Sequence, residues 1–338
     1  MPGLPSRARA ILASYRELAA VLAAAILGLS VQRPLAWLAG HQGINVLLAI
    51  LVVATAVTID PAALRRLAGA WRSLLAALIV GITVLPALSW AVSRMVAAGS
   101  LRDGVLAVGL APCEIASVAT TAMAGGEAAV SAGVLIGSTV AAVALAGPIL
   151  TLEAGHAGVS PGAIIANLAL VVALPLAVGI AARACAELAP RTPSGTARLL
   201  APTRVLASAH AESIAASTAL AAVAALVALV AAEVHLSAAY LAVAAALLVF
   251  LLGSALAGLA LGARSARPTA TALLLTTSMR DFAIAAGLAA AAFGPAAAAP
   301  LGLYGVAVLV WGTAVAGVLR QRSARAPAQE IRTQTNLS

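Results

Sequence analysis

Three ionisable residues lie inside long apolar runs of the sequence: Glu114 in one run, and the adjacent pair Arg280 and Asp281 in another. A charged side chain at the centre of a bilayer costs roughly 2.5–3.5 kcal/mol on insertion scales, so such residues face protein or water and need partners. The formal charges of the three sum to −1. That sum leaves room for one proton or cation, or for Arg280 to contact an anion. Ion or charged-solute binding is the chemistry that this set favours.

The composition places these residues in a membrane protein. Of the 338 residues, 63% are hydrophobic and 9% charged, and the mean hydropathy is +1.07. A soluble domain is about half apolar and roughly a quarter charged, so a soluble enzyme and a disordered chain are excluded. The net charge of +9 would indicate nucleic acid in a soluble protein. Here the basic residues are spread between apolar runs, so we expect a lipid bilayer and no nucleic-acid partner.

The elements that must position the three residues are membrane spans, each of about 20 apolar residues. Charged residues, prolines and glycines divide the chain into ten apolar runs. The expected spans are 18–36, 43–59, 74–93, 104–123, 129–150, 161–182, 213–232, 237–262, 269–291 and 297–318. The segments 1–17 and 319–338 are then terminal tails.

Arginine placement predicts the orientation. With ten spans, 16 arginines fall on the side of the two termini and 3 on the other side. Because arginine near span ends stays in the cytoplasm during insertion, both tails are expected in the cytoplasm and the protein in the plasma (inner) membrane.

The fourth and ninth runs resemble each other. In both, a segment that begins with arginine (Arg102 or Arg267) leads through an apolar stretch to the ionisable residues, and the two copies are about 165 residues apart. Five spans separate them, and an odd number inverts the second copy, as in many secondary transporters. The predicted fold is all-α, with inverted five-helix repeats over 18–150 and 161–318.

Interrupted helices would accommodate the charges. Pro112 precedes Glu114 and disturbs a helix, and hydroxyl side chains satisfy backbone groups freed where a membrane helix unwinds. The hydroxyl residues next to the charges are Ser117, Thr120, Thr121, Thr276, Thr277 and Ser278. Helices 4 and 9 are therefore predicted to be discontinuous and to cross near mid-membrane. The alternative is a buried ion-pair network that only joins the two spans.

At these residues the chain resembles the bile acid:sodium symporter family, within the bile/arsenite/riboflavin transporter superfamily. The resemblance covers 112–149, including Gly-Gly-Glu-Ala-Ala-Val-Ser from Gly125, and 279–294, ending in Ala-Ala-Phe-Gly at Gly294. It implies a core domain containing spans 4 and 9, a panel domain of spans 1, 2, 6 and 7, and alternating access between them. The implied function is secondary active transport of a small organic anion, as a symporter.

The sodium sites that the resemblance implies are altered in this chain. Ser117 and Ser131 match the family pattern. The other positions depart from it, at Gly81, Val118, Leu135, Thr276 and Arg280. Because a guanidinium cannot ligate sodium, its charge is expected to replace an absent cation, and the coupling ion is sodium at an atypical site or a proton. The candidate substrate and ion site comprises Glu114, Ser117, Ser131, Thr276, Thr277, Ser278, Arg280 and Asp281. Without substrate, Arg280 is predicted to pair with a carboxylate.

Two other functions stay open. Ala111-Pro112-Cys113, together with Asp281 shortly before Ala283-Ile284-Ala285, resembles the arsenite permeases, which makes Cys113 a candidate As(III) ligand and implies arsenite or antimonite efflux. A lone cysteine in an apolar helix is more often a small hydrophobic residue. The second alternative is a non-transporting membrane sensor, although the tail after the last span is short for a signalling domain. Enzymatic activity is not expected, and the sequence indicates no oligomeric state.

Overall fold

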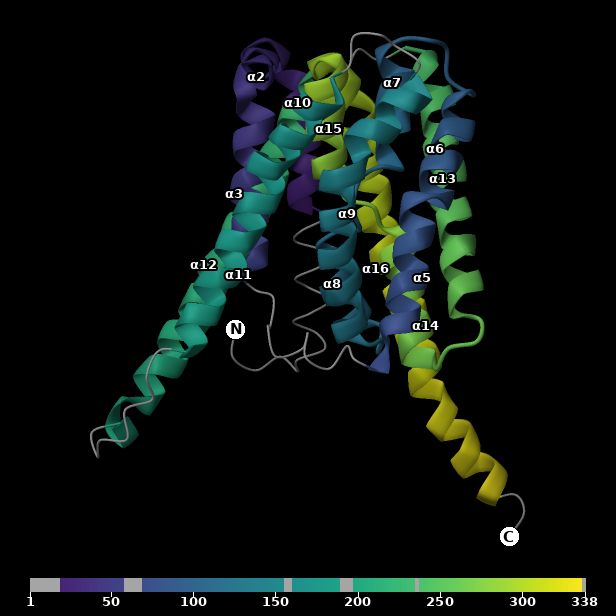
Figure 1. Ribbon diagram of the computed structural model, residues 1–338. Helices are drawn as coiled ribbons and strands as arrows, with labels where there is room; N and C mark the ends of the chain where they lie inside the picture. The colour runs from purple at the N-terminus through teal and green to yellow at the C-terminus, as the bar shows by residue number, and fades with distance from the viewer. Residues whose placement is uncertain (1–18, 58–68, 155–159, 189–196, 235–236, 336–338) are drawn as a thin grey trace.

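The protein is a bundle of helices (Figure 1). The computed structural model describes residues 19–57, 69–154, 160–188, 197–234 and 237–335. Within these ranges the chain is helical and forms no strand. In chain order, an unlabelled helix over Ala19–Ser30 is followed by α2 (Gln32–Leu38), η1 (Ala39–Gly43), α3 (Ile44–Ala56), α5 (Trp71–Ile82), α6 (Val84–Ser93), α7 (Ser100–Val108), α8 (Ala116–Met123), α9 (Ala128–Ala154), α10 (Pro161–Leu168), η3 (Ala169–Ala173), α11 (Leu174–Leu188), α12 (Ala197–Ala232), α13 (Ala239–Gly262), α14 (Arg267–Ser278), α15 (Phe282–Phe293), η4 (Pro295–Ala298) and α16 (Ala299–Thr335).

Seven helices of the described chain are long and apolar enough to cross a membrane. They cover Gln32–Ala56, Trp71–Ser93, Ala128–Glu153, Pro161–Cys185, Ser213–Ala232, Ala239–Gly262 and Pro295–Gln321. The last six correspond to the predicted spans 3, 5, 6, 7, 8 and 10. The all-α, multi-pass character is therefore confirmed, whereas the ten-span inverted-repeat topology stays a prediction.

The first two predicted spans differ most from the structure. The expected helix over 18–36 ends at Ser30, and α2 begins at Gln32. Between α2 and α3, His41 and Gln42 leave the helical conformation. Pro34 lacks the N–H group that would continue the first helix past Ser30, and Gly40 and Gly43, on either side of the kink, give the backbone conformational freedom there. Arg33 and Pro34 interrupt the first apolar run in the sequence, in agreement with the break after Ser30, whereas the kink at His41 and Gln42 was not predicted.

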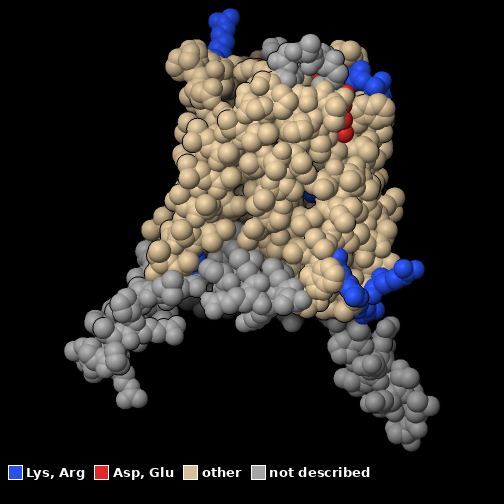
Figure 2. All heavy atoms as spheres, viewed as in Figure 1, with Lys and Arg blue, Asp and Glu red and all other residues tan. Residues whose placement is uncertain are grey.

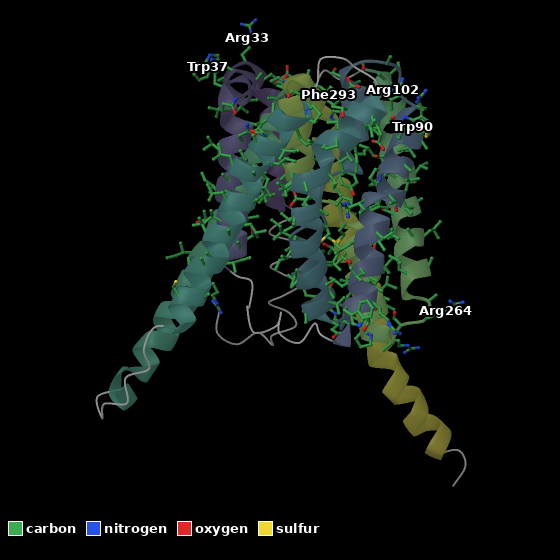
Figure 3. The ribbon with its side chains drawn as sticks, in the orientation of Figure 1. Arg33, Trp37, Trp90, Arg102, Arg264 and Phe293 are labelled. Carbon is green, nitrogen blue, oxygen red and sulfur yellow. The ribbon has the colours of Figure 1, made fainter. Side chains whose placement is uncertain are left out.

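The face seen in Figure 2 carries almost no charged side chains over most of its height, and those that it shows gather near the two ends of the bundle. Many large hydrophobic side chains are exposed, among them Ile26, Leu152 and Leu241. Arg33 and Arg102 lie at one end and Arg264 at the other, with Trp37 and Trp90 at the first end (Figure 3). Tryptophan and arginine are typical of the two membrane–water interfaces. The surface thus has the form expected of an integral membrane protein.

The helices pack in two groups (Figure 1). α3 packs against α11 and α12, and α2 lies against α12. On the other side, α13 packs closely along α14, while α15 contacts α7 and α16. The first group contains the segments expected to form the panel domain and the second group contains the core segments. The division into domains remains a prediction, but this packing is compatible with it.

Candidate functional site

Both predicted interruptions are confirmed. The fourth predicted span divides into α7, which ends at Val108, and α8, which begins at Ala116. The ninth divides into α14, which ends at Ser278, and α15, which begins at Phe282. The backbone of Met279 and Asp281 is extended there, with ψ of 104° and 103°. Each long segment therefore contains non-helical backbone whose polar groups need partners.

The two interruptions satisfy each other. The backbone N–H of Glu114 donates to the carbonyl of Met279 at 2.8 Å, and that of Asp281 donates to the carbonyl of Pro112 at 2.9 Å. Cys113 and Arg280 form an isolated antiparallel bridge between these bonds. We call residues 112–114 and 279–281 the crossing ribbon. Backbone polar groups inside a bilayer must be satisfied by protein, so each break stabilises the other.

The ribbon is held by the long helices on either side of it. Ser138 of α9 accepts a hydrogen bond from the backbone N–H of Cys113 at 3.1 Å. On α16, the hydroxyl of Tyr304 accepts from the backbone N–H of Arg280 at 3.3 Å, and the indole N–H of Trp311 donates to the hydroxyl of Ser278 at 3.0 Å. The first two contacts satisfy ribbon N–H groups that the opposite break leaves unpaired, and the third binds the last residue of α14, directly before the ribbon.

Side chains alternate between the two faces of an extended segment, and residues directly opposite in an antiparallel pair share a face. Cys113 and Arg280 are directly opposite each other, so their side chains lie on one face of the ribbon. Glu114 and Asp281 each follow one of these residues and lie on the other face. The ribbon thus separates a cationic face from an acidic face.

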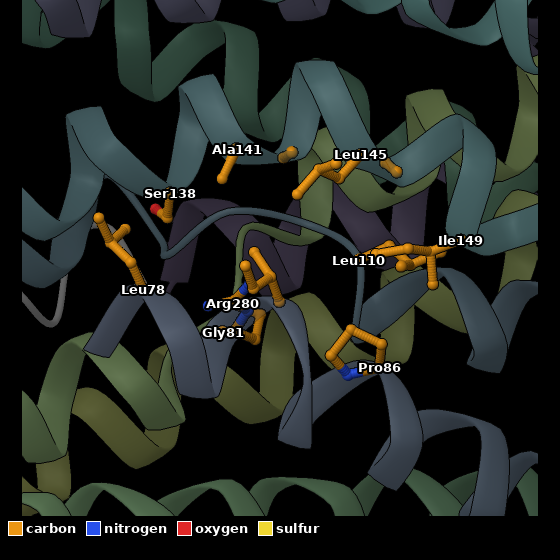
Figure 4. A pocket seen from close by; sticks show the side chains of 12 residues that line it. Leu78, Gly81, Pro86, Leu110, Ser138, Ala141, Leu145, Ile149 and Arg280 are labelled. Carbon is orange, nitrogen blue, oxygen red and sulfur yellow. The ribbon is translucent and has the colours of Figure 1, made fainter. Parts of the chain in front are cut away.

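The cationic face carries a single buried guanidinium. Arg280 is 4% exposed and donates through Nη2 to the carbonyl of Ala111, while its Nε has no hydrogen-bond partner. It lines a narrow cavity of about 20 Å³ between α5, α6 and α9, whose other lining residues include Leu78, Leu110 and Ser138 (Figure 4). That volume holds about one water molecule.

Gly81 makes room for this guanidinium. A Cβ built on Gly81 would lie 3.7 Å from Nη1 of Arg280, with no other atom within 4 Å. A longer side chain at position 81 would enter the space that the guanidinium occupies. The two departures from the family pattern at Gly81 and Arg280, unrelated in sequence, are therefore neighbours in space.

The acidic face is bounded by the starts of two helices. Asp281 caps α15, since its Oδ1 accepts from the backbone N–H of Ile284 at 2.8 Å. Glu114 lies two residues before α8. Negative charge is favoured at a helix N-terminus. Oδ2 of Asp281 and Oε2 of Glu114 are buried without a hydrogen-bond partner, so each carboxylate keeps one oxygen available.

One expectation about the charged residues is wrong in this conformation. In the described chain, no salt bridge or hydrogen bond joins Arg280 to Glu114 or Asp281. The alternation of side chains across the ribbon is the reason, because it directs the guanidinium away from both carboxylates. The ion-pair network considered as the alternative is absent for the same reason.

The hydroxyl residues of the predicted site are buried, but their hydrogen bonds go to different partners. Ser117 donates toward the sulfur of Cys113 at 3.9 Å, and Ser131 accepts from Thr121 at 3.3 Å. Thr276 and Ser278 donate to carbonyls of their own helix, α14, and Thr277 is also buried. The structure thus places Ser117 and Ser278 beside the ribbon, whereas Ser131 bonds away from it.

Several residues around the ribbon were not predicted from the sequence. Ser138 and Tyr304 bond the ribbon backbone, and Trp311 bonds the hydroxyl of the adjacent Ser278; none of the three is charged. Ser138 follows Ser131 by seven residues, which places both on one face of a helix, and this spacing was the available signal. Among the described residues, no group of three or more histidine, cysteine, aspartate or glutamate side chains gathers as metal ligands would.

Comparison with known families identifies the group to which this architecture belongs. The model of the sodium bile acid symporter family matches residues 45–244, which is more than half of the chain. The chain belongs to the sodium bile acid symporter family. No curated protein matches it. The family match includes Gly81 and the first half of the ribbon and ends before Arg280 and Asp281. As a member of this family of membrane symporters, the chain is an integral, multi-pass membrane protein.

Proposed function

We propose that this family member is a secondary active transporter of a small organic anion, and that Arg280 binds the anionic group. The observation that carries the proposal is the guanidinium on the cationic face, which lines an apolar cavity with its Nε unpartnered. At about 4 Å and an effective dielectric constant near 20, one charge pair is worth roughly 4 kcal/mol. An anion that reaches Arg280 therefore gains a large part of its binding free energy there.

The acidic face is the place for the coupling cation in this proposal. Glu114 and Asp281 each keep one buried oxygen without a partner, and together they outweigh the charge of Arg280 by one. A sodium ion or a proton at these oxygens would neutralise the ribbon when it is empty of substrate. Because the same six ribbon residues carry both faces, occupation of one face changes the electrostatic field at the other.

Transport requires that the anion site open to each side in turn. The cavity at Arg280 is too small for an organic anion in this conformation. Movement of the predicted panel helices, α3, α10, α11 and α12, against the helices that hold the ribbon would widen the access to it. We propose alternating access by such a movement, with both termini in the cytoplasm.

A fluorescent protein fused to the C-terminus should fluoresce, whereas a fused alkaline phosphatase should be inactive; the reverse result contradicts this orientation.

The test of the function is flux into proteoliposomes that contain the purified protein. Radiolabelled acetate, lactate, hexanoate and cholate are supplied in turn, with an imposed sodium gradient, an imposed proton gradient, or neither. We expect at least one carboxylate to accumulate when one of the two gradients is imposed. Arsenite flux that is lost in Cys113→Ala, without carboxylate flux, would instead support the arsenite alternative, and absence of any flux would support the sensor alternative.

A further inference from the structure

A second, larger cavity lies away from the crossing ribbon. It measures about 340 Å³ and lies between the start of α3, α10 and the end of α15. Its polar lining consists of Gln42, Asn45, Ser160 and Asn167, and α15 supplies Ala291 and Ala292 as an apolar wall. We call this the amide cavity. No ionisable side chain lines it, so any ligand is recognised there by hydrogen bonds and shape rather than by an opposite charge.

The amide groups of the cavity are arranged so that hydrogen-bond donors remain free. The Nδ2 group of Asn45 donates to Oε1 of Gln42 and, at 3.3 Å, to Oδ1 of Asn167. Those two bonds use both protons of Asn45. An amide NH₂ group carries two donors, and the NH₂ groups of Gln42 and Asn167 have no acceptor among the described residues. The cavity therefore offers up to four N–H donors from neutral side chains.

The backbone at Gln42 is unusual and contributes to this arrangement. Its φ of +68° makes it the one non-glycine residue of the described chain with a positive φ. That conformation is uncommon for residues with a side chain and is concentrated at functional sites. Gly40 and Gly43 are close by and glycine would adopt the conformation without cost. Glutamine in its place supplies an acceptor for Asn45 and a donor group to the cavity.

The location of the cavity fits an entry point. It lies at the end of α15, whose other end follows Asp281 of the crossing ribbon. From Asp281 to Ala291 a helix rises about 15 Å, which is about half the thickness of the hydrocarbon core. α10 also begins at the cavity, where Ser160 caps it, and the positive end of a helix favours anions.

We propose that the amide cavity is an entry site where a carboxylate first binds, through the NH₂ groups of Gln42 and Asn167, before it moves to Arg280. The ligand class is a small organic anion with an oxygen-rich head group, and this inference rests on the proposed function. Neutral donors bind a carboxylate without burying a fixed positive charge, so the anion is released readily toward the stronger site. The amide cavity lies at the end of α15, next to Phe293. Phe293 is at the same bundle end as Arg33 and Arg102 (Figure 3), which the small number of arginines predicts to be the non-cytoplasmic end.

Kinetics of three variants in proteoliposomes test the role of the donors. Asn167→Ala removes one donor group, and Gln42→Gly removes the other while relieving the backbone. Gln32→Ala is the matched control, since this amide lies on α2 outside the cavity and donates to the carbonyl of Val234. For the transported carboxylate, we expect KM to rise about tenfold in each cavity variant, with kcat changed less than twofold and the control unchanged. Unchanged KM in both cavity variants would overturn the inference.

Labelling of a cysteine gives a readout that needs no transport. Ala291→Cys places a thiol in the apolar wall of the amide cavity and keeps both donor groups. It is introduced together with Cys185→Ser, which removes the exposed native thiol; the other native cysteine, Cys113, is buried. A membrane-impermeant maleimide added from the non-cytoplasmic side should label the new thiol, and acetate, lactate, hexanoate or cholate should slow the labelling. No protection by any of the four would overturn the inference whatever the flux. Protection without flux of any carboxylate would support the entry site and contradict the proposed transport.

Discussion

At the scale of single residues, the alternation of side chains along the six residues of the crossing ribbon separates its positive charge from its negative charges. Arg280 and Cys113 face one side of the ribbon, and Glu114 and Asp281 face the other. A helix would have spread the same four side chains around its circumference. The short non-helical segments place the guanidinium and the two carboxylates on opposite faces of the ribbon. There each charge affects the electrostatic field at the other face without forming a direct ion pair.

Asp281 has a structural role that can be separated from its charge. Its side chain caps α15 by accepting from Ile284, and asparagine caps helices about as well as aspartate, whereas alanine costs about 1 kcal/mol. We expect Asp281→Asn to keep the apparent Tm of the wild type in detergent and Asp281→Ala to lower it by roughly 2–4 °C. Both variants should lose the response of carboxylate flux to the imposed cation gradient. Full gradient-driven accumulation in Asp281→Asn would remove this carboxylate from the coupling site.

Substitutions of Gly81 test whether carboxylate transport requires the space beside the guanidinium of Arg280. A methyl group at this position makes an ordinary contact with Arg280, so Gly81→Ala should transport at a rate close to that of the wild type. The larger Gly81→Leu should lower carboxylate flux at least tenfold, because its side chain displaces the guanidinium. Gly317→Leu is the control, since a Cβ at Gly317 meets no atom within 4 Å. Equal flux in Gly81→Leu and Gly317→Leu would contradict the arrangement of the cationic face.

At the scale of helices, a clamp joins the two interrupted segments at the ends of α8 and α14 that lie away from the crossing ribbon. The hydroxyl of Thr269, in the first turn of α14, donates to Oε2 of Glu127 at 2.8 Å. The backbone N–H of Glu127 donates to the carbonyl of Pro268 at 3.0 Å. Glu127 lies between α8 and α9, so the clamp connects the α8–α9 turn to the start of α14. Together with the crossing ribbon, it fixes α8 and α14 at two separate points.

Removal of the clamp should weaken the bundle. Thr269→Val deletes a hydrogen bond to a carboxylate, for which we expect a loss of about 1–2 kcal/mol in unfolding free energy. Thr313→Val is the matched control, because the hydroxyl of Thr313 is exposed and bonds only within α16, to the carbonyl of Leu309. Thermal unfolding in detergent measures both. Similar Tm values for the two variants would show that the clamp contributes nothing measurable.

The helices themselves were largely predictable, and the reason is physical. Apolar length alone locates α9, α13 and the end of α12, because a bilayer requires it. Pro112 and the charges after Ser278 also indicated where two helices break. The faces of the ribbon were not predictable, since they depend on pairing between residues that are far apart in sequence. The contacts of Tyr304 and Trp311 depend on how α16 packs against the rest of the bundle, and no local sequence pattern indicates that packing.

At the scale of the whole molecule, the two proposed sites lie at opposite ends of one helix, α15. The crossing ribbon stands at the start of α15 and the amide cavity at its end. A solute that passes from one to the other exchanges neutral donors for a full positive charge, while the acidic face remains on the opposite side of the ribbon. The helices expected to form the panel domain pack on one another, and α10 and α12 also contact α9 and α16; we propose that they move as a group against these helices during alternating access.

Carboxylate uptake by Arg280→Gln in proteoliposomes, compared with the wild type at equal amounts of inserted protein, tests whether Arg280 binds the anion. The variant keeps a side chain of similar length and removes the charge that we assign to anion binding. We predict that the variant inserts normally and that uptake falls to the level of empty liposomes. Uptake equal to that of the wild type would contradict the assignment of Arg280 as the anion site.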